Sequence, residues 1–280
     1  MKIVKYVINP ILSFLLILAI LCSIAISLIS KTILNKKYVL SKLDETEFYL
    51  QVSREVQSGF ENYIYQSGLP EDTIKDLYAE ELLKEDINSI IEYIYNGTEI
   101  KISSEKVRET LDNKINEYIS TQNIKLTSQG KENIKQFEDL VVSEYSKNVN
   151  VSNTLYSTAK EYKEKVETVY KKIKNIPITI AIIVTIILIL INIKEFLVAL
   201  NWISISSLSA GILLKIGEHV ISKNIDIDNL VVLAKSLSNL IINIAKEILF
   251  GISEKGNLFI ICGFTGIIAT AICRNFPKKK

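Results

Sequence analysis

The chain has 280 residues, of which 48% are hydrophobic and 23% are charged, and its formal net charge is +2. So small a net charge creates no strong field around the protein, and we therefore do not expect nucleic acid as a partner. All three cysteines, Cys22, Cys262 and Cys273, lie in apolar segments. This placement excludes a disulfide scaffold and predicts that the cysteines are small buried hydrophobic residues.

Charged and apolar residues are segregated along the chain. Residues 7–30, 176–193, 196–214 and 257–273 carry no charged side chain, whereas residues 31–175 carry 21 Lys and Arg and 25 Asp and Glu. A helix needs about 20 apolar residues to cross the hydrocarbon core of a bilayer. The pattern predicts an all-α membrane protein with about four transmembrane helices and a helical-bundle soluble domain inserted between the first and second spans.

Residues 1–30 are predicted to be an N-terminal transmembrane anchor, with an apolar stretch from Val7 to Ser30. The rival interpretation is a cleaved signal peptide, whose apolar core usually has about 7–15 residues and ends at a small-residue cleavage site. This stretch is longer, and Leu21 is too large for a lipoprotein cleavage site before Cys22. An uncleaved helix is therefore the prediction.

Residues 31–175 are predicted to form a helical extracytoplasmic domain that ends in a stalk helix. Apolar side chains recur at helical spacing in five segments, as in a bundle of amphipathic helices. These stripes are Phe48, Val52, Val56, Phe60 and Ile64; Leu83, Ile87, Ile90, Ile91 and Ile94; Val107, Leu111, Ile115 and Ile119; Ile134, Phe137, Leu140, Val141 and Tyr145; and Leu155, Ala159, Tyr162, Val166, Val169 and Ile173.

The segments between the stripes carry signals for helix ends. The first stripe belongs to a helix expected over residues 44–66, and a short helix over residues 71–78 follows it. Asn96-Gly97 ends the next helix, and residues 98–102 are expected to be an extended connector. A serine stands where it could cap each of the last three helices: Ser103 or Ser104, Ser128 and Ser152.

The last stripe has 4-3-4-3-4 spacing, which is typical of a heptad seam, and it runs almost directly into the second span. A rigid stalk kinked near Pro177 is expected there. Twelve of the thirteen tyrosines lie in this domain. They indicate either an aromatic recognition surface or tyrosines at the core edge with hydroxyls in water. The pairs Tyr63/Tyr65 and Tyr93/Tyr95 are the best candidates for an exposed rim.

Residues 176–280 are predicted to form the membrane domain, with spans over residues 176–193, 196–214 and 257–273. Only Lys194 and Glu195 separate the first two of these, so a tight hairpin is expected. In the middle span, Asn201, Ser204, Ser207 and Ser209 would suit a substrate path. The pairs Ser206/Ala210 and Ser207/Gly211, together with Gly263 and Gly266, favour close helix packing instead.

Residues 230–252 are long enough to cross a membrane but carry a polar stripe. The stripe consists of Lys235, Asn239, Asn243 and Lys246. An amphipathic helix of this kind usually lies in the plane of the membrane interface, which is the prediction. A span that lines a pore is the alternative.

Four spans place both termini on one side of the membrane. Lys2, Lys5, Lys194 and the basic tail after Arg274 predict that this side is cytoplasmic, although lysines also flank the domain. We therefore expect a multi-pass protein of the cell membrane with residues 31–175 outside the cytoplasm. Abundant Ile, Asn and Lys beside a single Trp and a single Met indicate an AT-rich bacterial genome.

No segment matches a catalytic, nucleotide-binding or zinc-binding motif. The single histidine, His219, has only Glu218 beside it, which is too few ligands for zinc. We expect no catalytic, cofactor or metal residues and no enzyme; binding residues stay unknown. The predicted function is a binding, interaction or structural module whose partners are the lipid bilayer and either another protein or a second copy. The alternatives are a transporter or channel component and a sensor that lacks its own output domain.

Overall fold

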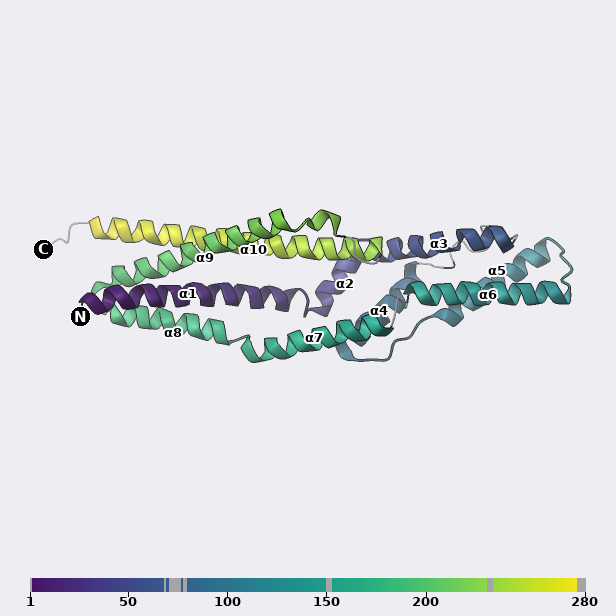
Figure 1. The fold of residues 1–280 in the computed structure, drawn as a ribbon, viewed down its shortest axis with the longest axis horizontal. Helices are drawn as coiled ribbons and strands as arrows, with labels where there is room; N and C mark the ends of the chain where they lie inside the picture. The colour runs from purple at the N-terminus through teal and green to yellow at the C-terminus, as the bar shows by residue number, and fades with distance from the viewer. Residues whose placement is uncertain are drawn as a thin grey trace. The chain divides into compact units, whose positions relative to one another are not determined.

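The structure, a computed structural model, describes residues 2–67, 69–70, 77, 80–149, 153–230 and 234–275. These residues contain helices and no strand, which confirms the all-α prediction for the described part of the chain (Figure 1). The helices are α1 (Lys2–Lys31), α2 (Lys36–Glu45), α3 (Phe48–Ser67), α4 (Glu80–Asn96), α5 (Ser104–Thr121), α6 (Ser128–Val149), α7 (Asn153–Ile173), α8 (Ile176–Ile191), α9 (Phe196–Asn224) and α10 (Lys235–Asn275), with short 3-10 helices η2 (Ile193–Glu195) and η3 (Ile227–Asn229).

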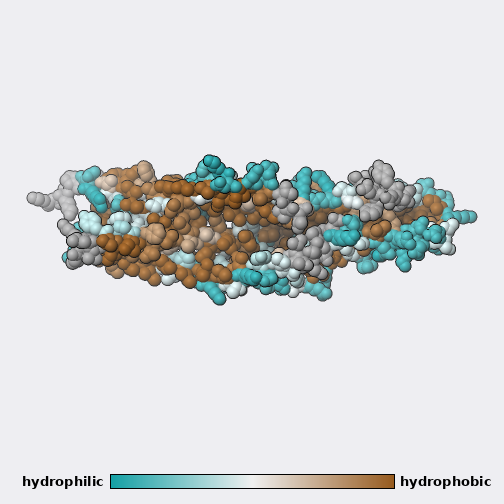
Figure 2. Space-filling view, in the orientation of Figure 1, coloured by the Kyte–Doolittle hydropathy of each residue, from teal (hydrophilic) through white to brown (hydrophobic). Residues whose placement is uncertain are grey.

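Among the described residues, 4 helical stretches are long and apolar enough to cross a membrane. They are Lys5–Lys31, Tyr156–Ile191, Ile193–Asn224 and Lys235–Asn275. Three of them contain a whole predicted span, and Tyr156–Ile191 contains all of the span over residues 176–193 except its last two residues. The surface over α1, α8 and α10 is correspondingly hydrophobic (Figure 2). The prediction of a multi-pass membrane protein with four spans is confirmed at the level of helix length and composition.

The chain divides into two compact units. The membrane unit consists of Met1–Tyr38, Val166–Val231 and Ile241–Lys280, and the helical unit consists of Val39–Lys165 and Val232–Leu240. The helical unit is therefore shorter at both ends than the predicted domain over residues 31–175. It also includes the first turns of α10, which lie far away in the sequence.

In the membrane unit, α1 packs against α8 and α9, and α8 also contacts α9 (Figure 1). Leu12 and Leu16 of α1 and Val184 and Leu188 of α8 form the buried core of this packing. None of the 16 residues of α8 is charged. The sides of α8 that lie outside the buried core therefore expose isoleucines such as Ile182. A helix that is apolar on every side suits a hydrocarbon solvent.

The two ends of the membrane unit can be identified from contacts between its helices. Ser13 of α1 contacts Ser206 of α9, and the Thr270 hydroxyl of α10 donates to Asn201 of α9 over 3.4 Å. The start of α1, the start of α9 and the end of α10 therefore lie at the same end of this unit.

In the helical unit, the predicted stripes form the core. Val56, Phe60, Leu83, Val107, Leu111, Ile115, Val141 and Tyr145 are at most 1% exposed. Leu140 is an exception to its predicted stripe, because it is 50% exposed while its neighbour Val141 is fully buried. Successive side chains on a helix are about 100° apart, so Leu140 and Val141 point in different directions.

Several predicted boundaries differ from the structure. The helix expected over residues 44–66 is divided between α2 and α3 by a turn in which Glu47 has a φ of 51°. Residues 98–102 lack regular structure, as expected of a connector. The short helix over residues 71–78 lies outside the described residues, apart from Leu77.

The predicted caps also differ. Ser103 occupies the N-cap position of α5, but its side chain makes no capping hydrogen bond. At the start of α6, Thr127 rather than Ser128 acts as the cap, because its hydroxyl accepts from the Gly130 N–H at 3.1 Å. Ser152 lies outside the described residues.

Helix α7 ends at Ile173, and the two-residue turn before α8 places Pro177 in the first turn of α8, as predicted. In the predicted heptad seam of α7, Tyr162, Val169 and Ile173 are 65%, 55% and 37% exposed. Helix α7 therefore carries exposed apolar side chains at these three positions.

Helix α10 differs most from the sequence prediction. It is a single helix of 41 residues, which at about 1.5 Å per residue is roughly twice the ~30 Å thickness of a bilayer core. A separate in-plane helix over residues 230–252 would need a break before the span over residues 257–273. The described residues show no such break, so the amphipathic segment and the last span are one helix.

Candidate functional site

A reciprocal amide pair joins two membrane helices near one end of the membrane unit. The Asn192 side chain donates to Oδ1 of Asn9 at 3.0 Å, and Asn9 donates back to Oδ1 of Asn192 at 3.4 Å. Asn192 also donates to the Leu188 carbonyl at 2.9 Å. Both asparagines are buried, at 3% and 0% exposure. The pair satisfies polar groups that would otherwise face hydrocarbon, and it fixes the register of α1 against α8.

A second polar contact joins α1 to α9. The hydroxyl oxygens of Ser13 and Ser206 lie 2.6 Å apart, and Ser206 lies 2.9 Å from the Trp202 carbonyl that accepts from it. Both serines are at most 4% exposed. Their small side chains allow the helices to approach closely while the hydroxyls stay bonded, as predicted for Ser206.

Helices α9 and α10 approach through glycines. A Cβ added at Gly263 would lie 2.4 Å from the backbone nitrogen of Leu208, and one added at Gly266 would lie 2.1 Å from the hydroxyl oxygen of Ser204. The Ser207 hydroxyl donates to the Phe259 carbonyl at 2.9 Å. The packing role predicted for Gly263 is confirmed, because the closest atoms belong to the backbone of Leu208. At Gly266 the helices are also close, but the Ser204 hydroxyl could move to admit a side chain.

The residues of the predicted polar stripe of α10 make different contacts along the helix. Asn239 donates to Gln51 of α3 at 2.7 Å within the helical unit. Lys246 forms an ion pair with Asp228 within the membrane unit. Lys235 and Asn243 are exposed. The stripe serves different contacts at different heights of a long helix.

The first turn of α10 is bound by a carboxylate from α3. Glu55 accepts from the Ser236 N–H at 2.8 Å and from the Ser236 hydroxyl at 2.7 Å. A carboxylate is favourable at a helix N-terminus because the first N–H groups have no partner in the helix and carry partial positive charge. This contact attaches α10 to the helical unit, and sequence analysis did not identify it.

Asp86 is the most deeply buried carboxylate among the described residues, at 1% exposure. One of its oxygens accepts from the Ser103 hydroxyl at 2.7 Å, and the other accepts from the Tyr145 hydroxyl at 2.8 Å. The Ser103 N–H points at both oxygens, at 3.0 and 2.9 Å. Asp86 thus joins α4 to the start of α5 and to α6. The sequence-based predictions did not include Asp86, although its position three residues after Leu83 places it near the apolar face of α4.

A second acidic group lies between α5 and α6. Glu138 is 9% exposed, and burial raises the pKa of its carboxyl, with a further increase from the neighbouring Asp112 carboxylate. Arg108 lies 3.9 Å from Glu138 and 2.7 Å from Asp139, and it partly opposes the increase. The described residues contain no group of three or more side chains that could hold a metal ion.

The tyrosines of the predicted rim lie under lysines of α7. The ammonium groups of Lys160 and Lys163 lie 4.7 Å and 5.4 Å from the ring centres of Tyr93 and Tyr95. Both tyrosines are half-buried, and burial raises the pKa of Tyr95 to about 12. These two tyrosines therefore contribute cation–π contacts inside the helical unit. The side chains of Tyr63 and Tyr65 lie outside the described residues.

The cysteine prediction is wrong in one respect. Cys22, Cys262 and Cys273 are free, but all three are exposed rather than buried. They lie on the outer faces of α1 and α10, among other exposed apolar side chains. His219 is also exposed, on the extension of α9 beyond the predicted span.

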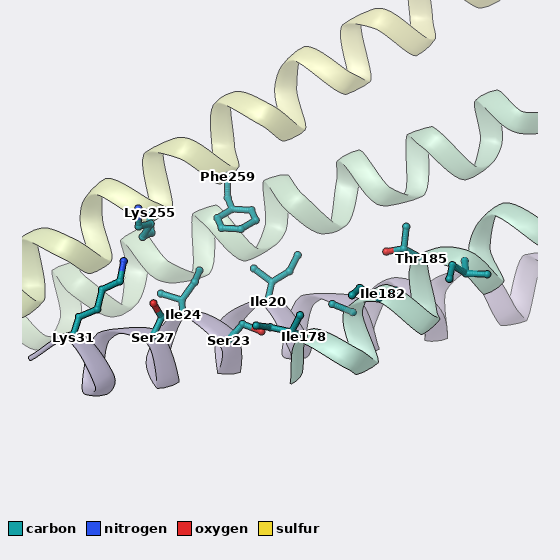
Figure 3. Close-up of a pocket in the computed structure, with 12 residues that line it drawn as sticks. Ile20, Ser23, Ile24, Ser27, Lys31, Ile178, Ile182, Thr185, Lys255 and Phe259 are labelled. Carbon is teal, nitrogen blue, oxygen red and sulfur yellow. The ribbon is translucent and has the colours of Figure 1, made fainter. Parts of the chain in front are cut away.

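A groove of about 660 Å³ lies between α1, α8 and α10 of the membrane unit (Figure 3). Its walls are mainly apolar, and include Ile20, Ile182 and Phe259. Lys31 and Lys255 lie together at one end, as the close-up shows. The groove has the size and apolar character of a ligand site. It is the candidate functional site of the membrane unit.

Comparison of the chain with family models, curated proteins and solved structures gave no match.

Proposed function

We propose that the protein is a multi-pass membrane protein in which the four apolar helices act as a packed anchor and the helical unit acts as an interaction module. The observation that carries the proposal is the pairing of polar side chains between membrane helices. Asn9 bonds to Asn192, and Ser13 contacts Ser206. Polar groups that bond to each other hold helices together and are not available to line an aqueous path.

The contacts of α10 support an anchor over a transporter or channel component. The transport hypothesis rested on the polar stripe and on the hydroxyl groups of the third span. Asn239 bonds to Gln51, and Ser207 bonds to the Phe259 carbonyl. Side chains engaged in helix contacts of this kind support a structural role, and no catalytic chemistry is part of the proposal.

The module contacts its partner through exposed apolar residues of α7 and α6. Tyr162 is 65% exposed and Leu140 is 50% exposed. Exposed tyrosine is a common contact residue at protein interfaces. The partner is another protein or a second copy of the chain, and the domain lies outside the cytoplasm with both termini inside.

Photo-crosslinking in intact cells tests the proposal. A photoreactive amino acid is placed at Tyr162 or Leu140, and at Leu213 of α9 as a control, which is 47% exposed but lies in an apolar helix. Discrete protein adducts are expected from the first two positions and lipid adducts alone from Leu213. The adduct mass separates a second copy from a different protein.

Two results would contradict the proposal. The first is the absence of protein adducts from both positions of the helical unit. The second is a solute or ion flux through vesicles containing the purified protein that exceeds the flux through empty vesicles. The second result would favour the transport alternative.

Orientation is tested separately by cysteine labelling. Gln122 lies in the exposed turn after α5 and is replaced by cysteine in a chain whose three native cysteines are changed to serine. A membrane-impermeant reagent is expected to label this position in intact cells. Labelling only after permeabilisation would invert the proposed orientation.

A further inference from the structure

We propose that the groove between α1, α8 and α10 binds one anionic phospholipid, with an acyl chain along the groove and the phosphate between Lys31 and Lys255. This site goes beyond the proposed interaction function and depends only on the insertion of the membrane unit in a bilayer. Its basis is the shape of the groove, its length and the charge at its end.

The length of the groove fits one leaflet. Its wall on α1 runs from Ile20 to Lys31, which is roughly 16 Å at the helical rise of about 1.5 Å per residue. The hydrocarbon core of a bilayer is about 30 Å thick, so this distance is about half of the core. An acyl chain that extends from the headgroup region to the bilayer midplane would occupy such a wall.

The walls suit an acyl chain. Apolar side chains from three helices face the groove, among them Ile24, Ile178 and Phe259 (Figure 3). The Ser23 hydroxyl also lies on the wall, but it donates to the Ala19 carbonyl of its own helix at 2.7 Å. It therefore presents no unsatisfied donor to a hydrocarbon chain.

The charge at one end selects the headgroup. Lys31 is the last residue of α1, and Lys255 immediately precedes the apolar residues of the last span, so both stand at the level where apolar sequence ends. Among the described residues, no carboxylate lies within ion-pair distance of either ammonium. A phosphate at this level would supply the missing negative charge.

Other lysines near the same boundary differ in this respect. Lys215 lies 3.5 Å from Glu218 and donates to the Ser253 hydroxyl at 2.5 Å. Lys171 lies 2.6 Å from Glu167. These two lysines already have partners, so they provide a matched control with the same loss of charge.

Native mass spectrometry of the full-length protein in mild detergent tests the site. The probes are dioleoyl phosphatidylglycerol and dioleoyl phosphatidylcholine, which have identical chains and different charge. The expected result is one tightly bound phosphatidylglycerol and at least about ten-fold weaker binding of phosphatidylcholine. The double variant K31Q/K255Q should bind phosphatidylglycerol about thirty-fold more weakly, at about ten-fold per 1.4 kcal/mol and about 1 kcal/mol per lysine. The control K171Q/K215Q should bind like the unmodified protein.

A second pair of variants tests the groove itself. Ser27 is exposed and lines the groove, whereas Ala25 is exposed on the same helix and does not. Ser27→Phe should reduce phosphatidylglycerol binding more than ten-fold, and Ala25→Phe should not. Equal binding of the two lipids, equal effects of the two lysine pairs, or full binding by Ser27→Phe would each overturn the proposal.

Discussion

Replacement of Asp86 by alanine should destabilise the helical unit strongly. The carboxylate accepts hydrogen bonds from the Ser103 N–H, the Ser103 hydroxyl and the Tyr145 hydroxyl. Tyr145 is 0% exposed, so water cannot easily take the place of the carboxylate at its hydroxyl, while half-buried Ser103 can reach water. A hydrogen bond to a charged group contributes about 1.5–3 kcal/mol, and the loss of the two bonds to Ser103 adds to the loss of the bond to Tyr145. The expected loss is about 2–4 kcal/mol.

The assay is thermal proteolysis of the full-length protein in detergent, in which cleavage reports unfolding of the helical unit. For a unit of this size the loss corresponds to a drop of roughly 10 °C in the midpoint temperature. Tyr145→Phe removes one of these bonds and should have a smaller effect in the same direction. Glu85→Ala is the control, because Glu85 is the preceding residue and forms only an exposed ion pair with Lys106 among the contacts described.

The reasoning would be refuted if Asp86→Ala and Glu85→Ala had the same midpoint. That outcome would mean that Tyr145 and Ser103 find other partners at no cost. A lower midpoint for Asp86→Ala with an unchanged midpoint for Tyr145→Phe would instead place the whole contribution on the Ser103 bonds.

Three further predictions concern single positions. Gly263→Ala should lower thermal stability in detergent by about 1–3 kcal/mol, because the added Cβ would lie 2.4 Å from the backbone of Leu208. The control Gly217→Ala adds a Cβ in open space and should be neutral or stabilising. Equal effects of the two substitutions would contradict the close packing at Gly263. Asn192→Leu leaves its amide partner on α1 unpaired and should cost about 1–2 kcal/mol in the same assay, and an unchanged midpoint would show that the amide pair contributes nothing. The raised pKa of Glu138 means that the folded state binds a proton more tightly than the unfolded state, so stability should fall as the pH rises above the ordinary value of 4.5. Glu138→Gln should remove this part of the pH dependence and be more stable than the unmodified protein at pH 7. Thermal proteolysis of both proteins between pH 4 and pH 7 measures the difference. Parallel pH profiles of the two proteins would contradict the predicted role of Glu138.

The sequence predicted most of the helices and the membrane spans correctly. Apolar runs of sufficient length identified the four candidate spans, because crossing a bilayer is a requirement on length and polarity alone. In the stripe of Val107, Leu111, Ile115 and Ile119 the first three residues are fully buried and Ile119 is half-buried, since helical periodicity determines which residues share one face. The packing role of Gly263 followed from its small size.

The predictions that failed concern boundaries and neighbours. The predicted stripe that includes Leu140 is wider than the buried face of α6. The cysteines lie in apolar segments, as the prediction of burial assumed, but they are exposed. The prediction of an in-plane helix over residues 230–252 requires a break before the last span, and α10 shows none. No proline stands between residues 235 and 256, and Gly251 and Gly256 each cost a helix only about 1 kcal/mol. A change from polar to apolar character along a helix does not by itself end the helix.

The sequence by itself determined which segments are helical, which faces are apolar and which four stretches are long enough to cross a membrane. Only the tertiary structure decided the pairing of Asn9 with Asn192, the bonds of Asp86 to α5 and α6, and the groove that ends at Lys31 and Lys255. The physical reason is that periodicity is a local property of the chain. A hydrogen bond or a groove depends on which helices become neighbours, and residues far apart in the sequence determine that.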